Sequence, residues 1–137
     1  TKEATNVCRC WAPTRQDNRF LRARKEYGYQ DCYITNSVKC GVRRGTRHTE
    51  KEIESCLGFL LKEINLVHPM VAVAMGQNAY YVLRRHIFIH MESPRIIFPM
   101  THYSAHGDIR PKWNHEFREL KLLLHKLRPR EQWESAV

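Results

Sequence analysis

DCYITNSVKCGVRRGTRHTEKEIESC, residues 31–56, is the stretch around which the rest of the chain can be arranged. Aromatic and β-branched side chains in residues 32–35 predict a short strand, which ends at the polar Asn36. Cys40 follows, then a loop rich in Arg, and then a helix whose first turns carry Cys56. Because open α/β sheets bind their ligands beyond the strand ends, we expect a functional site at this corner.

The segment after the basic loop has the signals of a helix followed by a strand. Thr49, with Glu52 three residues later, has the spacing of a capping box and predicts a helix start. The apolar residues behind it recur with the helical period, so one face should be buried. They are Ile53, Leu57, Leu60, Leu61 and Ile64. Pro69 stops this helix, and the run MVAVAM at 70–75 predicts a fully buried strand.

The carboxyl-terminal half continues this alternation. Gly76 provides a tight turn into a helix predicted over residues 77–85. Shorter apolar runs at 87–90 and 96–98 predict two further strands, and residues 100–111 form a loop rich in His and Gly.

Two more helices are predicted, one near each end. The last covers residues 113–127. Its apolar stripe is Trp113, Phe117, Leu120, Leu124 and Leu127. Upstream, Asn18 is placed to cap a helix over 19–27, which Gly28 would end. Alternating strands and helices predict an α/β fold, a three-layer α/β/α sandwich with a short central parallel sheet.

The composition fits one folded domain. With 137 residues and 42% hydrophobic residues, the chain can bury a core as a single domain over 1–137. Residues 1–17 form a Cys-bearing amino-terminal segment, and 128–137 a polar tail. No apolar run approaches the ~20 residues of a membrane span. No signal peptide is visible, so we expect an intracellular location, either cytoplasm or nucleoid, or an organelle if a transit peptide was removed.

The charge balance and the Cys count both restrict the function. Lys and Arg number 23 against 14 Asp and Glu, for a net charge of +9, which favours a polyanionic partner such as nucleic acid over a merely basic surface. The 5 Cys are an odd number and too sparse for a disulfide scaffold. Reduced thiols, some of which bind metal, fit better.

Four short motifs together resemble the uracil-DNA glycosylase superfamily, most closely its iron–sulfur branch, the fourth family. They are YITN-x-VKC at 33–40, T-x-x-E-I-x-x-C at 49–56, a Pro-to-Gly-to-Ala block at 69–79 and HYS at 102–104. They occur in the family order and cover roughly residues 29–127. The resemblance implies an α/β/α sandwich that flips a uracil out of DNA and hydrolyses its glycosidic bond.

The resemblance also assigns roles to single residues. Asn36 would recognise the uracil edge, since an amide offers one donor and one acceptor to an imide, although an Asn at a strand end can also simply cap a turn. His102 would stabilise negative charge on the departing base, and Ser104 would contact a backbone phosphate. Tyr103 replaces the Pro of the family motif.

The basic loop is a candidate for DNA contact. Arg43, Arg44 and Arg47 lie between the two Cys residues of the opening stretch. They would bind phosphates, or else remain solvated loop charges.

The family holds its cluster with four Cys. Cys40 and Cys56 match the second pair by motif and spacing. The first pair, normally Cys-x-x-Cys, would be Cys8 and Cys10, which are one residue closer together. The resemblance therefore implies a 4Fe-4S iron–sulfur cluster, for which thiolates are the required ligands. A structural zinc on the same sulfurs, or four buried thiols without metal, are the alternatives.

The largest departure from the family lies upstream. The family has an acidic residue in a G-E-A-P-G loop, where it positions the attacking water, and here Trp11 takes that place. Asp17 is the nearest carboxylate, and Phe20 the nearest substitute for the aromatic residue that stacks on uracil. Either a segment is missing or the active site is degraded. The second case predicts a catalytically inactive relative, a nucleic-acid-binding or structural subunit of a larger assembly, RNA-containing assemblies included.

Overall fold

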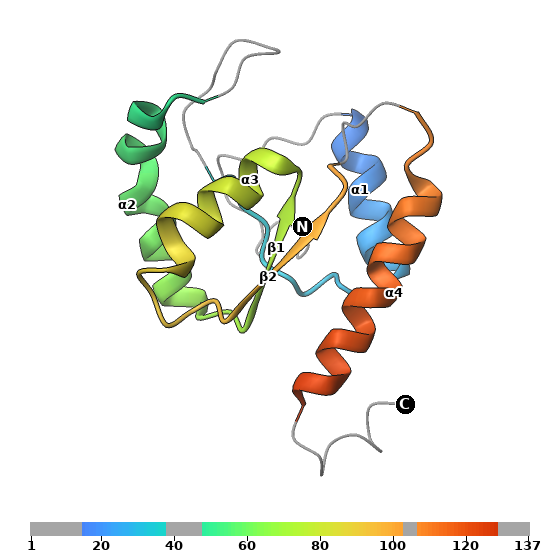
Figure 1. Ribbon diagram of the computed structural model, residues 1–137. Coiled ribbons are helices and arrows are strands. Elements are labelled where there is room, and N and C mark those ends of the chain that lie inside the picture. Colours follow the sequence, from blue (N-terminus) through green and yellow to red (C-terminus); the bar gives the residue numbers. More distant parts are fainter. Residues whose placement is uncertain (1–14, 38–47, 103–106, 129–137) are drawn as a thin grey trace.

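A two-stranded parallel sheet stands between two layers of helices in the computed structural model, which describes residues 15–37, 48–102 and 107–128 and the side chains from Phe20 onward (Figure 1). Strand β1 (Val71–Met75) pairs with β2 (Ile96–Met100), and the register places Val71 opposite Ile96. The parallel pairing confirms the predicted sheet type and the predicted strand near 96–98.

The helices cover both faces of this sheet, as the predicted sandwich requires. One layer consists of α2 (Glu50–Val67), α3 (Gln77–Val82) and the π-helical turn η2 (Leu83–Phe88), and the other of α1 (Arg15–Glu26) and α4 (Arg110–Leu127). Alternate residues of a strand point to opposite faces. Ala72 and Ala74 accordingly join the core under α2 and α3, whereas Val71 and Met75 join the core under α1 and α4.

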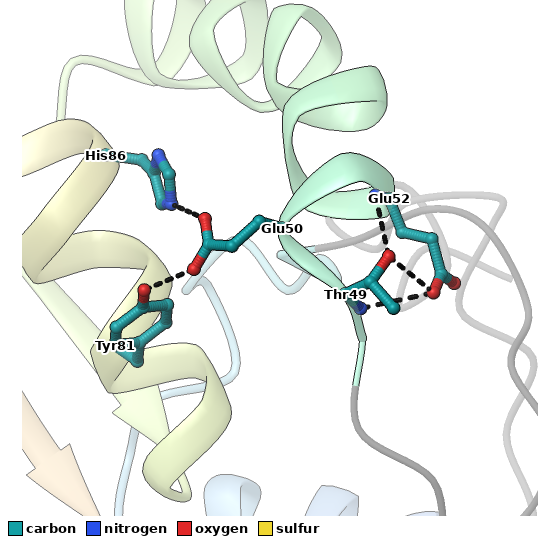
Figure 2. Close-up of polar contacts among 5 residues, drawn as sticks. All are labelled: Thr49, Glu50, Glu52, Tyr81 and His86. Carbon is teal, nitrogen blue, oxygen red and sulfur yellow. Dashed lines mark hydrogen bonds and ion pairs between the residues drawn. The ribbon is translucent and has the colours of Figure 1, made fainter.

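Helix α2 confirms its sequence signals. The Glu52 backbone N–H donates to Thr49 Oγ1 at 3.2 Å, and the Thr49 N–H donates back to Glu52 Oε1 at 3.1 Å (Figure 2). The helix ends at His68 in a left-handed conformation (φ 49°), one residue before Pro69. Its buried residues are Ile53, Cys56, Leu60 and Ile64, and the predicted Leu57 and Leu61 pack beside them.

Helices α1 and α4 both begin earlier than predicted. Helix α1 starts at Arg15, because Arg and Gln are good helix formers, so Asn18 lies inside the helix instead of capping it. Gly28 ends that helix as predicted, with a positive φ of 83°. Helix α4 starts at Arg110, since Pro111 fits a first turn, and of its predicted stripe Leu127 is 38% exposed and not core.

Three strand predictions are wrong in part. Residues 32–35 form no strand of the sheet, because an extended segment can place Ile34 in the core through a single bridge. Residues 87–90 are not a strand, since Ile87 lies in η2 and belongs to its buried face together with Leu83. Residues 70–75 are not fully buried, and Val73 is 39% exposed, because the described sheet has two strands and leaves part of β1 uncovered.

The helix after Gly76 is longer than predicted. It passes from α3 into η2 and reaches Phe88, not residue 85. In the described ranges, no helix has the length and apolar character to cross a bilayer.

Candidate functional site

The carboxyl ends of β1 and β2 meet at one edge of the sheet, and His102 lies there. Gly76 follows β1, and its N–H donates to the carbonyl of Met100 at the end of β2 at 2.9 Å. A Cβ on Gly76 would lie 3.1 Å from His102 Cβ and 3.3 Å from His102 Cδ2. The turn also has a φ of 90°, which only Gly adopts readily. Gly76 therefore gives the half-buried His102 its place against the start of α3.

Helix α4 holds the residue just before His102. The Glu116 carboxylate accepts the Thr101 N–H at 2.8 Å (Oε2) and 3.1 Å (Oε1), and it accepts the Thr101 hydroxyl at 3.1 Å. The Trp113 indole N–H donates to the Thr101 carbonyl at 2.9 Å. Hydrogen bonds to an ionised carboxylate are stronger than neutral ones, so Thr101 is held firmly.

A hollow of about 380 Å³ opens beside this edge. Its lining is Ser37, His48, Ile53, Gln77, Asn78, Tyr81 and Val82. Asn36, which is half-buried, immediately precedes the Ser of this lining, and Gly76 immediately precedes the Gln. The volume lies in the range of small-molecule pockets, and hydroxyl, amide and imidazole groups surround an apolar wall. The hollow is therefore large enough for a planar base.

A polar cluster ties the start of α2 to α3 and η2 (Figure 2). The Tyr81 hydroxyl donates to Glu50 Oε1, and His86 Nε2 lies 3.2 Å from Glu50 Oε2. The hydrogen bond from Tyr81 is the main cause that lowers the pKa of Glu50, and it raises the pKa of Tyr81. Because Tyr81 also lines the hollow, the cluster fixes one of its walls.

The predicted metal ligands are placed only in part. Cys56 is 2% exposed and packs in the core of α2 and α3. Cys8, Cys10 and Cys40 lie outside the described residues. In the part of the chain that the structure describes, no group of three or more His, Cys, Asp or Glu could hold a metal ion. The four-thiolate set stays a prediction, and the burial of Cys56 is compatible with it.

The other predicted site residues fall into four groups. Asn36 and His102 are described and half-buried, His102 at the sheet edge against Gly76 and Asn36 next in sequence to Ser37 of the hollow. Phe20 is 8% exposed and packs edge-on against Trp113 with ring centroids 5.9 Å apart, which does not favour a stacking role. Asp17 lies in α1, and its side chain is outside the described part. Outside the described residues, too, are Ser104, Arg43, Arg44 and Arg47.

The α4 residues that support His102 belong to none of the motifs identified in the sequence. Glu116 and Trp113 are three positions apart on α4 and therefore share a face, with the buried Phe117 beside them. The available signal was the Glu116 carboxylate, which borders the apolar stripe of α4 and is therefore a candidate for a contact inside the fold. Gln77 and Asn78 were assigned only to a helix, although two amides at a helix start after a Gly turn are candidates for a pocket wall.

Comparisons with known proteins support the family resemblance of the sequence motifs. A family model described as the uracil DNA glycosylase superfamily matches residues 5–127. Among the curated relatives is a type-4 uracil-DNA glycosylase from Thermotoga maritima, which is 40% identical over 50 residues, or 36% of this chain and 26% of the relative. Another, from Archaeoglobus fulgidus, is 34% identical over 50 residues, or 36% of this chain and 25% of the relative.

A longer match covers most of the chain. The type-4 uracil-DNA glycosylase of Saccharolobus solfataricus is 26% identical over 127 residues, which is 79% of this chain and 57% of the relative. The chain thus spans between a quarter and 57% of the lengths of these three curated relatives. No solved structure matches the chain significantly.

Proposed function

The chain belongs to the uracil DNA glycosylase superfamily, and from this membership we propose that it binds DNA and hydrolyses the N-glycosidic bond of a flipped-out uracil. One observation carries the proposal. His102, the residue that matches the His of the family motif, lies at the carboxyl edge of the parallel sheet, held by Gly76 and by the residue before it. The curated relatives carry the name type-4 uracil-DNA glycosylase.

In the proposed reaction the bond between sugar and base breaks first, and its electron pair leaves with the uracil. The His102 imidazole donates a hydrogen bond to the base oxygen where negative charge develops, which is the main catalytic contribution. Water adds to the sugar carbon and gives up a proton, so the products are free uracil and an abasic site. Asp17 is the candidate acceptor of that proton. Asn36 pairs with the uracil edge and selects the base.

Electrostatic attraction between basic side chains and phosphates would hold the DNA. Arg43, Arg44, Arg47 and Ser104 are the proposed phosphate contacts, and the net charge of +9 supports a polyanionic partner. The affinity should therefore fall steeply as salt increases.

A 4Fe-4S cluster on Cys8, Cys10, Cys40 and Cys56 is part of the proposal, with zinc as the alternative metal. The donor set fits, because four thiolates suit either centre. The metal centre would act structurally by holding the basic loop and the amino-terminal segment together, since metal binding is coupled to folding. Iron and sulfide content and charge-transfer absorbance test it; an anaerobic preparation that is colourless and free of iron would exclude the cluster.

One observation favours a second candidate function. Trp11 stands where the family motif has its acidic residue, and the second candidate is therefore an inactive relative that binds nucleic acid, RNA included, within a larger assembly. Such a protein would bind single-stranded DNA or RNA and release no base.

The deciding experiment measures uracil release from a uracil-containing single strand by the purified metal-loaded protein. We expect release, and a loss of about 10²–10³-fold in His102→Ala, the range for removal of a donor to a developing negative charge. The control is His115→Ala, which removes an exposed imidazole from α4. No release by the wild-type protein, together with retained binding of the strand, would overturn the enzyme and support the second candidate.

A further inference from the structure

Every polar atom of Thr101 forms a hydrogen bond with a side chain of α4. Its N–H and its hydroxyl both donate to the Glu116 carboxylate, and its carbonyl accepts from the Trp113 indole. Of this pair, Trp113 is 3% exposed and Glu116 is half-buried. These contacts cross 12 to 15 residues of sequence, so they are tertiary contacts and not part of a local turn.

These contacts fix two successive peptide planes. The plane between Met100 and Thr101 is held at its oxygen by the Gly76 N–H and at its nitrogen by Glu116. The next plane, between Thr101 and His102, is held at its oxygen by Trp113. A peptide bond is planar, so an anchored oxygen also fixes the nitrogen across the bond. The backbone nitrogen of His102 is therefore fixed, and the Gly76 turn packs against the His102 side chain.

We propose that Glu116 is a positioning residue for His102 and that α4, through Glu116 and Trp113, sets the place of its imidazole. The inference rests on the proposed function for its catalytic meaning, but the placement itself can be measured separately. A carboxylate is suited to this task, because its two oxygens accept from the N–H and the hydroxyl of one residue at the same time. The Thr101 N–H donates to both oxygens of Glu116. A Gln side chain has one oxygen, and its NH₂ group would face this N–H donor in place of the second oxygen.

The test compares Glu116→Gln with Glu119→Gln in the full metal-loaded protein. Both variants remove one negative charge from α4, but Glu119 is exposed on the helix. We expect Glu116→Gln to lower kcat for uracil release by about tenfold to a hundredfold with little change in KM, because displacing a catalytic group by ~1 Å can cost about 10²-fold. Glu119→Gln should leave both constants unchanged.

A second measurement reports the position of His102 directly. The Hα protons of Gly76 and the side chain of His102 are close enough for a nuclear Overhauser contact, assigned by its absence in His102→Gln. We expect Glu116→Gln to weaken or abolish this contact and Glu119→Gln to keep it. If Glu116→Gln does not fold, Thr101→Val replaces it, since the isosteric change removes only the hydroxyl contact; the expected loss is then smaller and in the same direction.

The outcomes separate the two claims. A folded Glu116→Gln protein that keeps both kcat and the Gly76–His102 contact overturns the positioning role. If the wild-type protein releases no uracil, the proposed function fails. The Overhauser contact alone then decides: its loss in Glu116→Gln supports the placement by α4, and its retention overturns it.

Discussion

The two helical layers of the sandwich differ in what their polar contacts hold. In the layer of α2, α3 and η2, Glu50 and Tyr81 link one helix to another at exposed positions (Figure 2). In the layer of α1 and α4, Glu116 and Trp113 reach the segment that follows β2. The first layer therefore joins helices and fixes one wall of the hollow through Tyr81, whereas the second holds the backbone that leads into His102.

Arg24 makes a similar contact with the segment that leads to Asn36, the other residue of the candidate site. It is 5% exposed on α1, and its guanidinium donates to the carbonyls of Tyr29 at 2.8 Å and of Gln30. These carbonyls belong to the segment that leads to Asn36. The α1 and α4 layer thus holds backbone groups on the way to both Asn36 and His102, the two residues to which the family motifs give direct roles. Helix α2 contacts the first of these segments through a side chain, because the Tyr33 hydroxyl donates to Glu63 at 2.6 Å. Substitutions in the two layers should therefore have different consequences for stability and for activity.

The largest expected effect is on stability, in the α2 layer. Leu60 is 4% exposed in the core, and Leu60→Ala should lower the free energy of unfolding by about 2–5 kcal/mol. Urea unfolding measures it, with Leu66→Ala as control on the same helix, since Leu66 is 86% exposed and should change by less than about 0.5 kcal/mol. Uracil release per folded molecule should not change. A lower kcat in folded Leu60→Ala would contradict the division between the layers.

The next prediction separates the backbone strain of a positive φ from the contact between Gly76 and His102. Gly76 and Gly28 both have positive φ, 90° and 83°, so replacing either with Ala should destabilise the fold by about 1–2 kcal/mol. Only Gly76 has His102 within reach of a Cβ, whereas nothing lies within 4 Å at Gly28. Gly76→Ala should therefore also lower kcat, and Gly28→Ala should not. Equal activity in the two variants would show that the Gly76 turn serves the fold alone.

The same contrast explains what the sequence could and could not predict. Helix α2 follows local rules, so the capping box at Thr49 and the helical period of its apolar residues were enough to place it. The face of α4 was predicted for the same reason. Local rules do not fix pairing, and the segment around Ile34 therefore looked like a strand although it forms a single bridge.

The support of the site could not be predicted in the same way. The contact of Glu116 with Thr101 joins residues 15 apart through the closure of the fold, and no local pattern encodes such a contact. The sequence marked His102 by its motif, and it placed the Glu116 carboxylate beside the apolar stripe of α4, but it did not indicate which residue that carboxylate would contact. The close approach of Gly76 was equally hidden, because a turn Gly looks the same whether its neighbour is a side chain or solvent.

A smaller effect is expected at the start of α2. Thr49→Ala removes the hydroxyl that accepts the Glu52 N–H, and losing such a cap typically costs about 1 kcal/mol. Thr49→Ser keeps the hydroxyl and is the control. Chemical denaturation measures both variants, and neither should change kcat. Equal stability of the Ala and Ser variants would show that water replaces the cap at this exposed helix start.

The smallest effect depends on pH and concerns the link between α2 and α3. The Tyr81 hydroxyl is the main cause that lowers the pKa of Glu50 from 4.5, with the charges of His86 and Arg85 adding to it. A lowered folded-state pKa means that this stabilisation is complete above the unfolded-state value, near 4.5, and is lost as pH falls through the folded-state value. Tyr81→Phe removes that hydrogen bond, so it should be slightly less stable than the wild-type protein at neutral pH. The difference should shrink as the solution is acidified below 4.5.

Thermal unfolding across this pH range measures the difference, with Tyr80→Phe as control, because it deletes the hydroxyl of the neighbouring residue on α3. Since Tyr81 and Glu50 are exposed, salt should weaken the effect as well. A Tyr81→Phe difference that is independent of both pH and salt would mean that the link acts through packing of the ring. The α2 layer would then resemble the α4 layer, where the Trp113 ring packs in the core while its N–H holds Thr101.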